Sequence, residues 1–376
     1  MRQDWKYISF EECLVKVPKQ KAVKSKDYLD EGLYPIVSQE SDLISGYSND
    51  ESLLYKHEKP IVIFGDHTKN IKYIDFDFIV GADGVHILSV KDNILPRFFY
   101  YELCSIKLRN LGYARHYKLL KEKEIGYPEK AEQEQIVALL DDQFAKIDQL
   151  KANADLQLRA AKDLFQSALK EIFILGQDWK YLPLGEITSS INGLWKGKKP
   201  PFVNVGVIRN ANFTKDFTLN LSNIEYLDVE ERQYSTRKLQ RGDLIVEKSG
   251  GSEKQPVGRT ILFDLEGEYS VSNFTSILRI KDKTLILPTF LYKFLLYIYK
   301  EGYTKEMQNA TTGIHNIIYD KFLSIRVPIP PLAEQERIAA RLDAISEKVK
   351  ALQANYDQTI TLCNDLKQAL LKSIFA

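Results

Sequence analysis

The stretch AEQEQIVALLDDQFAKIDQLKANADLQLRAAKDLFQSALKEIF, residues 131–173, decides the fold because the chain contains a second version of it. It aligns without a gap to residues 333–375, at an offset of 202, with 20 identities over 43 positions. Chance does not produce such a match, and an internal repeat constrains the architecture before any local propensity does. The chain therefore has two related halves, each ending in the same long segment.

Both repeated segments have the pattern of long helices. Prolines precede each copy, acidic residues occupy its first turn, and neither copy contains Gly or Pro, which is typical of an uninterrupted helix. Such a helix would extend about 65 Å. Apolar residues recur at alternating spacings of three and four, which predicts a coiled-coil seam formed by Ile136, Leu140, Ile147, Leu150, Ile338, Leu342, Ile345, Val349 and Leu352.

Two interpretations of these helices remain open. They could be unrelated amphipathic helices, each packed on its own domain. Equal lengths and equal seams in one chain favour the second interpretation, an antiparallel intramolecular coiled coil, because the domain between the two helices can return the chain to its starting end. Apolar residues away from the first seam, Val137, Leu139, Phe144 and Phe165, indicate a further partner surface.

The regions before the helices form two more variable modules. QDWKY occurs at residues 3–7 and again at 177–181, and PRFFYYEL from Pro96 resembles PTFLYKFL from Pro288. Each module mixes short β patterns with few helices. The predicted fold class is α/β, with modules at 1–130 and 176–332, long antiparallel coiled-coil helices at 131–175 and 333–376, and a pseudo-two-fold internal repeat.

Composition excludes several classes of protein. The chain has 376 residues, 44% of them hydrophobic and 27% charged, which describes a globular protein of about two domains. Its apolar runs are far shorter than the roughly 20 residues that span a bilayer, and its first residues carry no export pattern, so we expect a cytoplasmic location. Three scattered cysteines support neither a disulfide framework nor a zinc site.

Basic loops in the second module indicate contact with nucleic acid. Residues 176–332 hold 21 basic and 17 acidic side chains, although the whole chain has a net charge of only +1. Lys and Arg neutralise phosphates, and Arg and Asn read base edges, although a single Lys-rich or Gly-rich loop is more often a solvated turn. The candidates are Trp195, Lys196, Lys198, Lys199, Arg209, Asn210 and Lys254, and in the first module Lys69, Asn70, Arg115, His116 and Lys118.

These motifs resemble the specificity subunit of type I restriction-modification systems, over the whole chain. PIPPLAEQERIAARLDAI from Pro328 is similar to the start of the family's distal conserved helix, and AEQEQIVALLDD from Ala131 to that of its central one. GDLIVEKSGG, QPVGR and SNFTSILRI resemble a target-recognition-domain signature, which places Lys248, Ser249, Gln255, Arg259 and Asn273 at the corresponding positions. The first module departs from this signature and has PIVIFGDHTKN instead.

The resemblance implies a non-catalytic DNA-binding subunit. Its two target-recognition domains would each read one part of a split, asymmetric DNA sequence, while the helices fix the unread spacer. One such subunit would bind two methyltransferase subunits, which carry the S-adenosylmethionine, and restriction-translocase subunits complete the complex for DNA methylation and restriction. No cofactor or metal is expected in this chain, and no membrane.

Sequence motifs for chemistry are missing, and two other functions are weighed against DNA recognition. A methyltransferase needs Asn or Asp before Pro-Pro-aromatic, but the chain has Lys199 there, which cannot accept hydrogen bonds from a target amino group. Its five histidines show no metal-ligand spacing. The first alternative is an assembly adaptor whose modules bind protein rather than DNA. The second, a self-contained enzyme, would have to modify DNA unaided.

Overall fold

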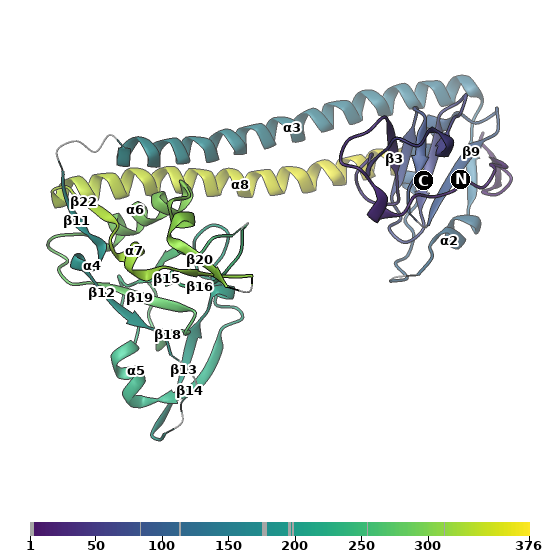
Figure 1. Cartoon of the computed structure of the whole chain (residues 1–376). Coiled ribbons are helices and arrows are strands. Elements are labelled where there is room, and N and C mark those ends of the chain that lie inside the picture. Colours follow the sequence, from purple (N-terminus) through teal and green to yellow (C-terminus); the bar gives the residue numbers. More distant parts are fainter. Residues whose placement is uncertain are drawn as a thin grey trace. The chain divides into compact units, whose positions relative to one another are not determined.

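The computed structural model describes residues 4–82, 84–112, 114–174, 179–194, 197, 199–253, 255–311 and 313–376 (Figure 1). The chain forms two compact units. Unit 1 comprises Met1–Asp155 and Tyr356–Ala376, and unit 2 comprises Leu156–Asn355. Each unit therefore contains one module and parts of both long helices.

Unit 1 contains two four-stranded sheets and a short terminal pair. One sheet has the order β2-β9-β6-β7, the other β4-β3-β8-β5, and β1 pairs with β10. The strands are β1 Lys6–Ser9, β2 Leu14–Val15, β3 Tyr34–Val37, β4 Gly46–Ser48, β5 Leu54–Tyr55, β6 Ile61–Gly65, β7 Ile71–Ile74, β8 Phe78–Val80, β9 Val85–Val90 and β10 Glu124–Tyr127. The helices are α1 Pro96–Ser105, α2 Tyr117–Lys121 and the first part of α3 Lys130–Ile174.

Unit 2 repeats the main sheet of unit 1 in the order β12-β19-β15-β17. Two three-stranded sheets, β14-β13-β18 and β16-β21-β20, and the pair β11-β22 complete it. The strands are β11 Lys180–Pro183, β12 Thr188–Asn192, β13 Phe202–Ile208, β14 Glu225–Glu230, β15 Leu244–Glu247, β16 Ser249–Gly251, β17 Thr260–Leu262, β18 Tyr269–Val271, β19 Thr275–Ile280, β20 Gln308–Thr311, β21 Ile314–Ile317 and β22 Arg326–Ile329. The helices are α4 Leu184–Ile187, α5 Glu231–Arg237, α6 Pro288–Lys300, α7 Tyr319–Leu323, the last part of α3 and the first part of α8 Leu332–Phe375, whose remainder belongs to unit 1.

The two long helices run antiparallel within each unit. In unit 1, Lys151 donates to Asn364 at 2.6 Å, and Lys367 donates to Asp148 at 2.6 Å. Residue numbers therefore decrease along α3 where they increase along α8, which is the antiparallel arrangement. In unit 2, Lys162 donates to Gln353 at 2.9 Å. The predicted antiparallel pair of helices is therefore confirmed, and independent helices on separate domains are excluded.

Each module is closed by one end of each long helix. In unit 1, Ile136 and Leu140 of α3 and Leu371 and Ile374 of α8 share one core with α1. In unit 2 the ends are exchanged, and the corresponding core contains Leu169 and Phe173 of α3 with Ile338 and Leu342 of α8, packed against α6. Burying these apolar side chains accounts for the long helices, because a rod of this kind is unstable without a partner.

A buried glutamine attaches each module to the start of its long helix. Gln133 and Gln335 hold equal positions in the repeat and are completely buried. Gln133 accepts a hydrogen bond from the backbone of Leu95 at 2.8 Å, and Gln335 accepts one from Leu287 at 2.8 Å. Each side-chain nitrogen donates to two backbone carbonyls. Both N–H groups and the oxygen of each amide therefore have hydrogen-bond partners inside the protein.

The seam prediction is correct at most positions and wrong at Leu150. Ile136, Leu140, Ile147, Ile338 and Leu342 are buried, and Ile345, Val349 and Leu352 are partly buried. Leu150 is 55% exposed, whereas Leu158 is buried. The seam continues from Ile147 through the half-buried stem of Lys151, because a long aliphatic side chain can cover apolar surface while its charge stays in solvent.

The predicted partner surface of the first helix is also revised. Val137 and Phe144 pack partly buried against the core of unit 1, and Phe165 packs against that of unit 2. Of these four residues only Leu139 is exposed, at 51%. Other exposed leucines of the two helices are Leu156, Leu164, Leu362 and Leu366.

Candidate nucleic-acid interface

Lys248 lies at the junction where β15 ends and β16 begins. Its backbone nitrogen donates to the carbonyl of Phe274 at 2.9 Å, and its ammonium donates to the side chain of Asn192 at 2.7 Å. Burial lowers the pKa of Lys248. The lysine is held at one place by these bonds, and its only described side-chain hydrogen-bond partner is a neutral amide.

Ser249 and Asn210 form the next part of this surface. The side-chain nitrogen of Asn210 donates to the backbone carbonyl of Ser249 at 2.6 Å, while its buried side-chain oxygen has no hydrogen-bond partner among the described residues. Gly250 has a φ of +100°, and a Cβ there would lie 3.0 Å from the Asn210 nitrogen. Only glycine adopts such a φ readily, which explains the glycine beside the candidate contacts.

Arg259, predicted to contact DNA, forms a largely buried ion pair instead, whereas the neighbouring Gln255 is exposed and stays a candidate contact. The Arg259 guanidinium donates to both carboxylate oxygens of Glu247, at 2.7 and 3.2 Å, and lies beside the side-chain amide of Gln255. The side chains of Arg259 and Glu247 are only 11% and 2% exposed. Burial raises the pKa of Glu247, and Arg259 acts in the opposite direction. The interpretation of Arg259 as a base contact is therefore corrected to a structural one.

We expect Arg259→Ala to destabilise the protein rather than to weaken DNA contact directly. Removing one partner of a buried ion pair leaves the other charge unpaired, which costs about 3 kcal/mol. Urea unfolding would measure this loss. Arg209→Ala is the matched control, because the Arg209–Glu225 pair is exposed at 41% and 47% and such pairs contribute at most about 1 kcal/mol. Unchanged stability together with lost DNA affinity would restore Arg259 as a contact.

Asn273 is exposed in the turn between β18 and β19, next to Phe274, which is 51% exposed. An exposed aromatic ring beside an amide could stack on a base while the amide forms hydrogen bonds. Phe274 also holds the Lys248–Ser249 backbone through its carbonyl. The candidates named from the sequence did not include Phe274 or Asn192, although Phe274 directly follows the candidate Asn273.

The remaining candidates of the second module are placed less favourably or are not described. Arg209 forms an ion pair with Glu225. Lys199 is exposed, and its backbone nitrogen donates to Glu230 at 3.1 Å. Trp195, Lys196, Lys198 and Lys254 lie outside the described residues.

In the first module, His116 is completely buried. Its Nδ1 lies 3.0 Å from the carbonyl of Asp66, and its Nε2 accepts from the backbone of Leu111 at 3.1 Å. Both ring nitrogens are therefore used inside the protein, so His116 supports the loop rather than contacting DNA. That part of the prediction is corrected.

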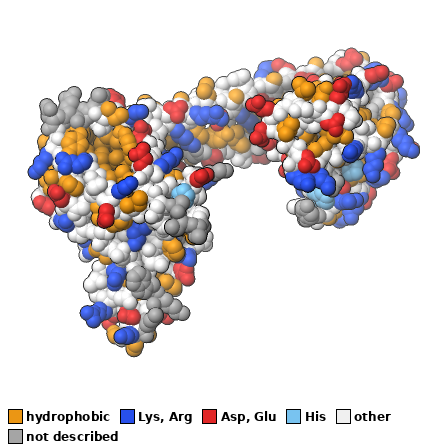
Figure 2. All heavy atoms as spheres, in the orientation of Figure 1, with side chains coloured by type: hydrophobic (Ala, Val, Ile, Leu, Met, Phe, Trp, Pro, Cys, Tyr) orange, Lys and Arg blue, Asp and Glu red, His pale blue; other side chains and the backbone are white. Residues whose placement is uncertain are grey.

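The other candidates of the first module lie around Asp66. The Asp66 carboxylate accepts from the backbone of Tyr117 at 2.8 Å and lies 3.4 Å from His86 Nε2 and 3.9 Å from Arg115 Nε. Arg115 is 82% exposed at its side chain, and Lys118 is exposed. Lys69 has a φ of 62°. Asn70 donates to the carbonyl of Gln39 at 2.9 Å. Figure 2 shows histidines among basic side chains on the surface of unit 1.

Strand registers show which positions of the two modules correspond. Val62 lies opposite Leu88 in the sheet of unit 1, and Leu244 lies opposite Leu278 in that of unit 2. Counting along these strands from the shared pairs, Asp66 corresponds to Lys248 and His86 corresponds to Ser276. The two modules therefore present different chemistry at the same structural position.

A tyrosine supports this position in both units. Tyr117, the first residue of α2, stacks on His86 with ring centroids 3.8 Å apart and an interplanar angle of 6°. Tyr319, the first residue of α7, accepts a hydrogen bond from the Ser190 hydroxyl at 2.8 Å and shares a 2.7 Å hydrogen bond with the Ser276 hydroxyl. Aligning VIFGD, residues 62–66, with LIVEK, residues 244–248, would have exposed the correspondence of Asp66 and Lys248 in the sequence.

Two other features, a metal-binding cluster and a membrane-spanning helix, are absent from the described residues. Among them, no cluster of three or more His, Cys, Asp or Glu side chains is placed to hold a metal. In the same part of the chain, no helix is long and apolar enough to cross a membrane.

Comparison with known proteins identifies the repeat. The model of the type I restriction modification DNA specificity domain matches residues 2–158 and 176–362, once for each half. The chain is 29% identical to the EcoKI specificity subunit of Escherichia coli K12 over 210 residues, 52% of this chain and 42% of that protein. It is 26% identical to the EcoR124I/EcoR124II specificity subunit of Escherichia coli over 371 residues, covering 92% of this chain and 87% of that one.

Solved structures show the same fold. A chain from a study of complex assembly and conformational transition of the type I R-M system matches with a TM-score of 0.69 at 20% identity, covering all of this chain and 98% of the other. The HsdS subunit of Thermoanaerobacter tengcongensis matches with a TM-score of 0.51 at 20% identity, covering 99% and 97%. Both similarities extend over both modules and both long helices.

Proposed function

Because the chain belongs to the type I restriction modification DNA specificity family, we propose that it selects the DNA sequence on which a type I restriction-modification enzyme acts. The proposal is that the two modules each read one part of a bipartite, asymmetric target. The repeat carries this proposal, since each copy of the family domain is closed by opposite ends of the same two helices. The chain itself would be non-catalytic.

Different chemistry at corresponding positions supports the reading of an asymmetric target. In unit 2, the Lys248 ammonium is a donor that suits the O6 and N7 acceptors of guanine. In unit 1, Asp66 and His86 occupy the matching positions, with the exposed Arg115 and Lys118 nearby for phosphates. Two identical readers would select a symmetric sequence, whereas these two carry different side chains at the matching positions, a partly buried lysine and a buried aspartate.

The long helices suit two roles in this proposal. Since both helices run from one unit into the other, their length would set the unread spacer between the half-sites. Their exposed leucines, Leu139, Leu156, Leu164, Leu362 and Leu366, suit burial against partner subunits. We propose two methyltransferase subunits, which would carry S-adenosylmethionine, and restriction-translocase subunits as those partners, with one copy of this chain per complex.

The competing proposal is an assembly adaptor whose modules bind protein rather than DNA. The two proposals differ in salt dependence, because DNA affinity falls steeply with salt as counterions are released. An adaptor would show no preference between DNA sequences.

We expect Lys248→Ala to weaken binding of the assembled complex to its target roughly tenfold, the loss of one good base contact. Lys283→Ala is the matched control, a solvent-exposed lysine of the same unit. Fluorescence anisotropy on target and scrambled duplexes would measure both affinities, and size-exclusion chromatography would show that assembly is intact. Equal affinity and target choice in both variants would remove Lys248 from the site, and binding without any sequence preference would contradict the proposed function.

A further inference from the structure

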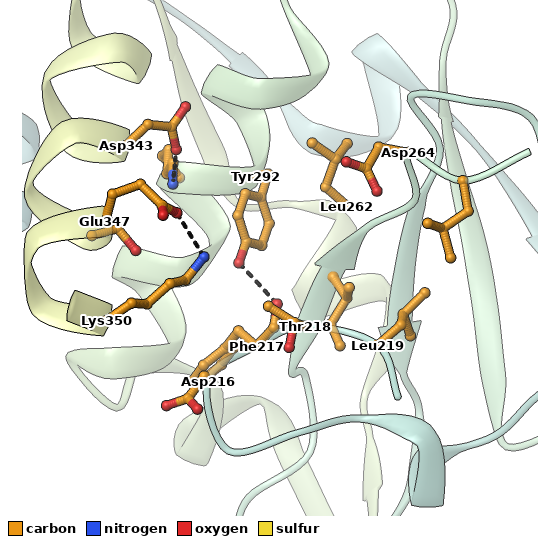
Figure 3. A pocket seen from close by; sticks show the side chains of 14 residues that line it. Asp216, Phe217, Thr218, Leu219, Leu262, Asp264, Tyr292, Asp343, Glu347 and Lys350 are labelled. Atoms are coloured by element: carbon orange, nitrogen blue, oxygen red, sulfur yellow. Dashed lines mark hydrogen bonds and ion pairs between the residues drawn. The ribbon is translucent and has the colours of Figure 1, made fainter. Parts of the chain in front are cut away.

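Unit 2 contains a hollow between α6, the two long helices and the loop before β14. It has two adjoining parts, of about 320 and 500 Å³, which share Asp216, Phe217, Tyr292 and Lys350 in their linings. Figure 3 shows the smaller part, with Tyr292 and Phe217 in the middle and Asp343, Glu347 and Lys350 on one side. The larger part has a volume typical of small-molecule sites, which run from roughly 300 to 1,000 Å³.

Lysines dominate the lining of the larger part. That lining contains a single carboxylate, Asp216, and five lysines, which are Lys162, Lys215, Lys293, Lys300 and Lys350. The Lys293 ammonium forms an ion pair with Asp343 at 2.5 Å, and the Lys350 ammonium forms one with Glu347 at 2.8 Å. Both carboxylates lie on α8. Lys162 donates only to the neutral Gln353 among the described contacts. The Lys300 ammonium lies 4.7 Å from the centre of the Phe217 ring. Burial lowers the pKa of Lys300, Asp216 raises it, and the charge of Lys162 lowers it further, so the pKa is lowered on balance.

Phe217 forms the floor of the hollow in a strained conformation. Its φ of 58° is rare for a bulky residue, and such strain often marks a functional position. Its carbonyl accepts from the Tyr292 hydroxyl at 3.1 Å, and its ring packs edge-on against Tyr299 at 5.4 Å. These contacts hold an aromatic surface beneath the lysines.

The corresponding hollow of unit 1 shows that the fold does not require this excess of charge. That hollow, of about 380 Å³, is lined by Tyr100, Asp141, Asp148, Arg97 and Lys367 among others. Arg97 pairs with Asp141 at 2.7 Å, and Lys367 pairs with Asp148 at 2.6 Å. At the 202-residue offset of the repeat, Asp148 corresponds to Lys350. Each cation that lines the hollow of unit 1 therefore has a carboxylate partner, whereas the lining of the larger part in unit 2 has more lysines than carboxylates.

We propose that the hollow of unit 2 binds a phosphate ester. Several converging ammonium groups suit an anion with more than one charge, and the rings of Phe217, Tyr292 and Phe165 offer apolar surface for the group that carries it. The phosphate could belong to a free nucleotide or to the backbone of a nucleic acid. The proposal goes beyond the selection of a target sequence and does not depend on it.

The test measures the binding of ATP to the full-length purified chain by isothermal titration calorimetry. We expect binding that Lys300→Gln weakens roughly tenfold, as expected for one desolvated charge-assisted contact. Lys215→Gln should weaken binding by a smaller factor, and since Lys215 and Lys300 are both at exposed positions, neither substitution should act through misfolding. Lys367→Gln, in the hollow of unit 1, is the matched control and should leave the affinity unchanged.

A second arm distinguishes the two sources of phosphate. The affinity for a 30-base-pair duplex of arbitrary sequence is measured against salt, and backbone contact predicts that Lys300→Gln lowers the salt slope by about one. Loss of ATP binding in Lys300→Gln supports the free nucleotide, and a lowered slope without ATP binding supports the backbone. If ATP binds no more weakly to Lys300→Gln than to the parent chain and the slope is unchanged, the proposal is wrong. A chain that binds ATP as expected but shows no sequence preference would contradict only the proposed function.

Discussion

Inserting seven residues into each long helix is expected to abolish methylation at the native targets and shift it to targets with a longer spacer. The insertions lie between Asn153 and Ala154 in α3 and between Thr361 and Leu362 in α8. Seven helical residues add about 10 Å, and DNA rises about 3.4 Å per base pair, so the spacer should lengthen by about three base pairs. Both half-site sequences should stay the same.

The contacts of the two helices determine where the insertions have to be made. Lys151 and Asp148 of α3 contact Asn364 and Lys367 of α8, and Lys162 contacts Gln353, so matched insertions between the first two contacts and the third preserve the antiparallel register. A length of seven residues preserves the heptad seam. An insertion in one helix alone would leave its seam without a partner.

Long-read methylation mapping in a host that carries the complete system measures this shift. The control places the same seven residues between Glu266 and Gly267, in the exposed turn between β17 and β18, and should leave the spacer as it is. A native spacer in the variant with both insertions would contradict the proposed role of the helices.

Leu371→Ala is expected to destabilise unit 1 by about 3 kcal/mol, within the range for truncating a fully buried leucine. Leu371 lies at the far end of α8, is 1% exposed, and belongs to the core that contains Phe98 and Leu140. The loss combines the removed burial with the cavity left behind. Since the core of unit 2 does not include this residue, unit 2 should keep its stability.

Amide hydrogen exchange on the full chain would separate the two units. Faster exchange should appear in β6 and α1 and not in β15 or α6. Leu362→Ala makes the same chemical change on the same helix at a position that is 58% exposed, where substitutions usually alter stability by less than about 0.5 kcal/mol. Equal effects of the two substitutions, or faster exchange in unit 2, would contradict the shared core.

The helices were predictable because their signal is long and repeated. Residues 131–175 and 333–376 were expected to be helical, and the structure has helices at Lys130–Ile174 and Leu332–Phe375. The error at Leu150 arose because the seam choice admitted only apolar residues, whereas the observed stripe includes the stem of Lys151. The division into four segments stays a prediction, since the compact units divide both helices between them.

The candidate site was predictable as loops but not as individual contacts. The sequence indicated the segment around Lys248, which the structure shows held at a strand junction. The sequence alone could not show that Arg259 is buried against Glu247 or that His116 uses both ring nitrogens internally. The sequence shows that a residue is basic, but it does not show whether the side chain faces solvent or a buried carboxylate.

The sequence by itself determined that the chain is a repeat of two modules and two long helices, because the heptad pattern and the internal identities are local and additive signals. Only the tertiary structure decided which ends of the helices close which module, and that Asp66 in one unit occupies the place of Lys248 in the other. These are pairings between residues far apart in the chain. They depend on the three-dimensional packing of strands and side chains, which no periodicity along a single chain records.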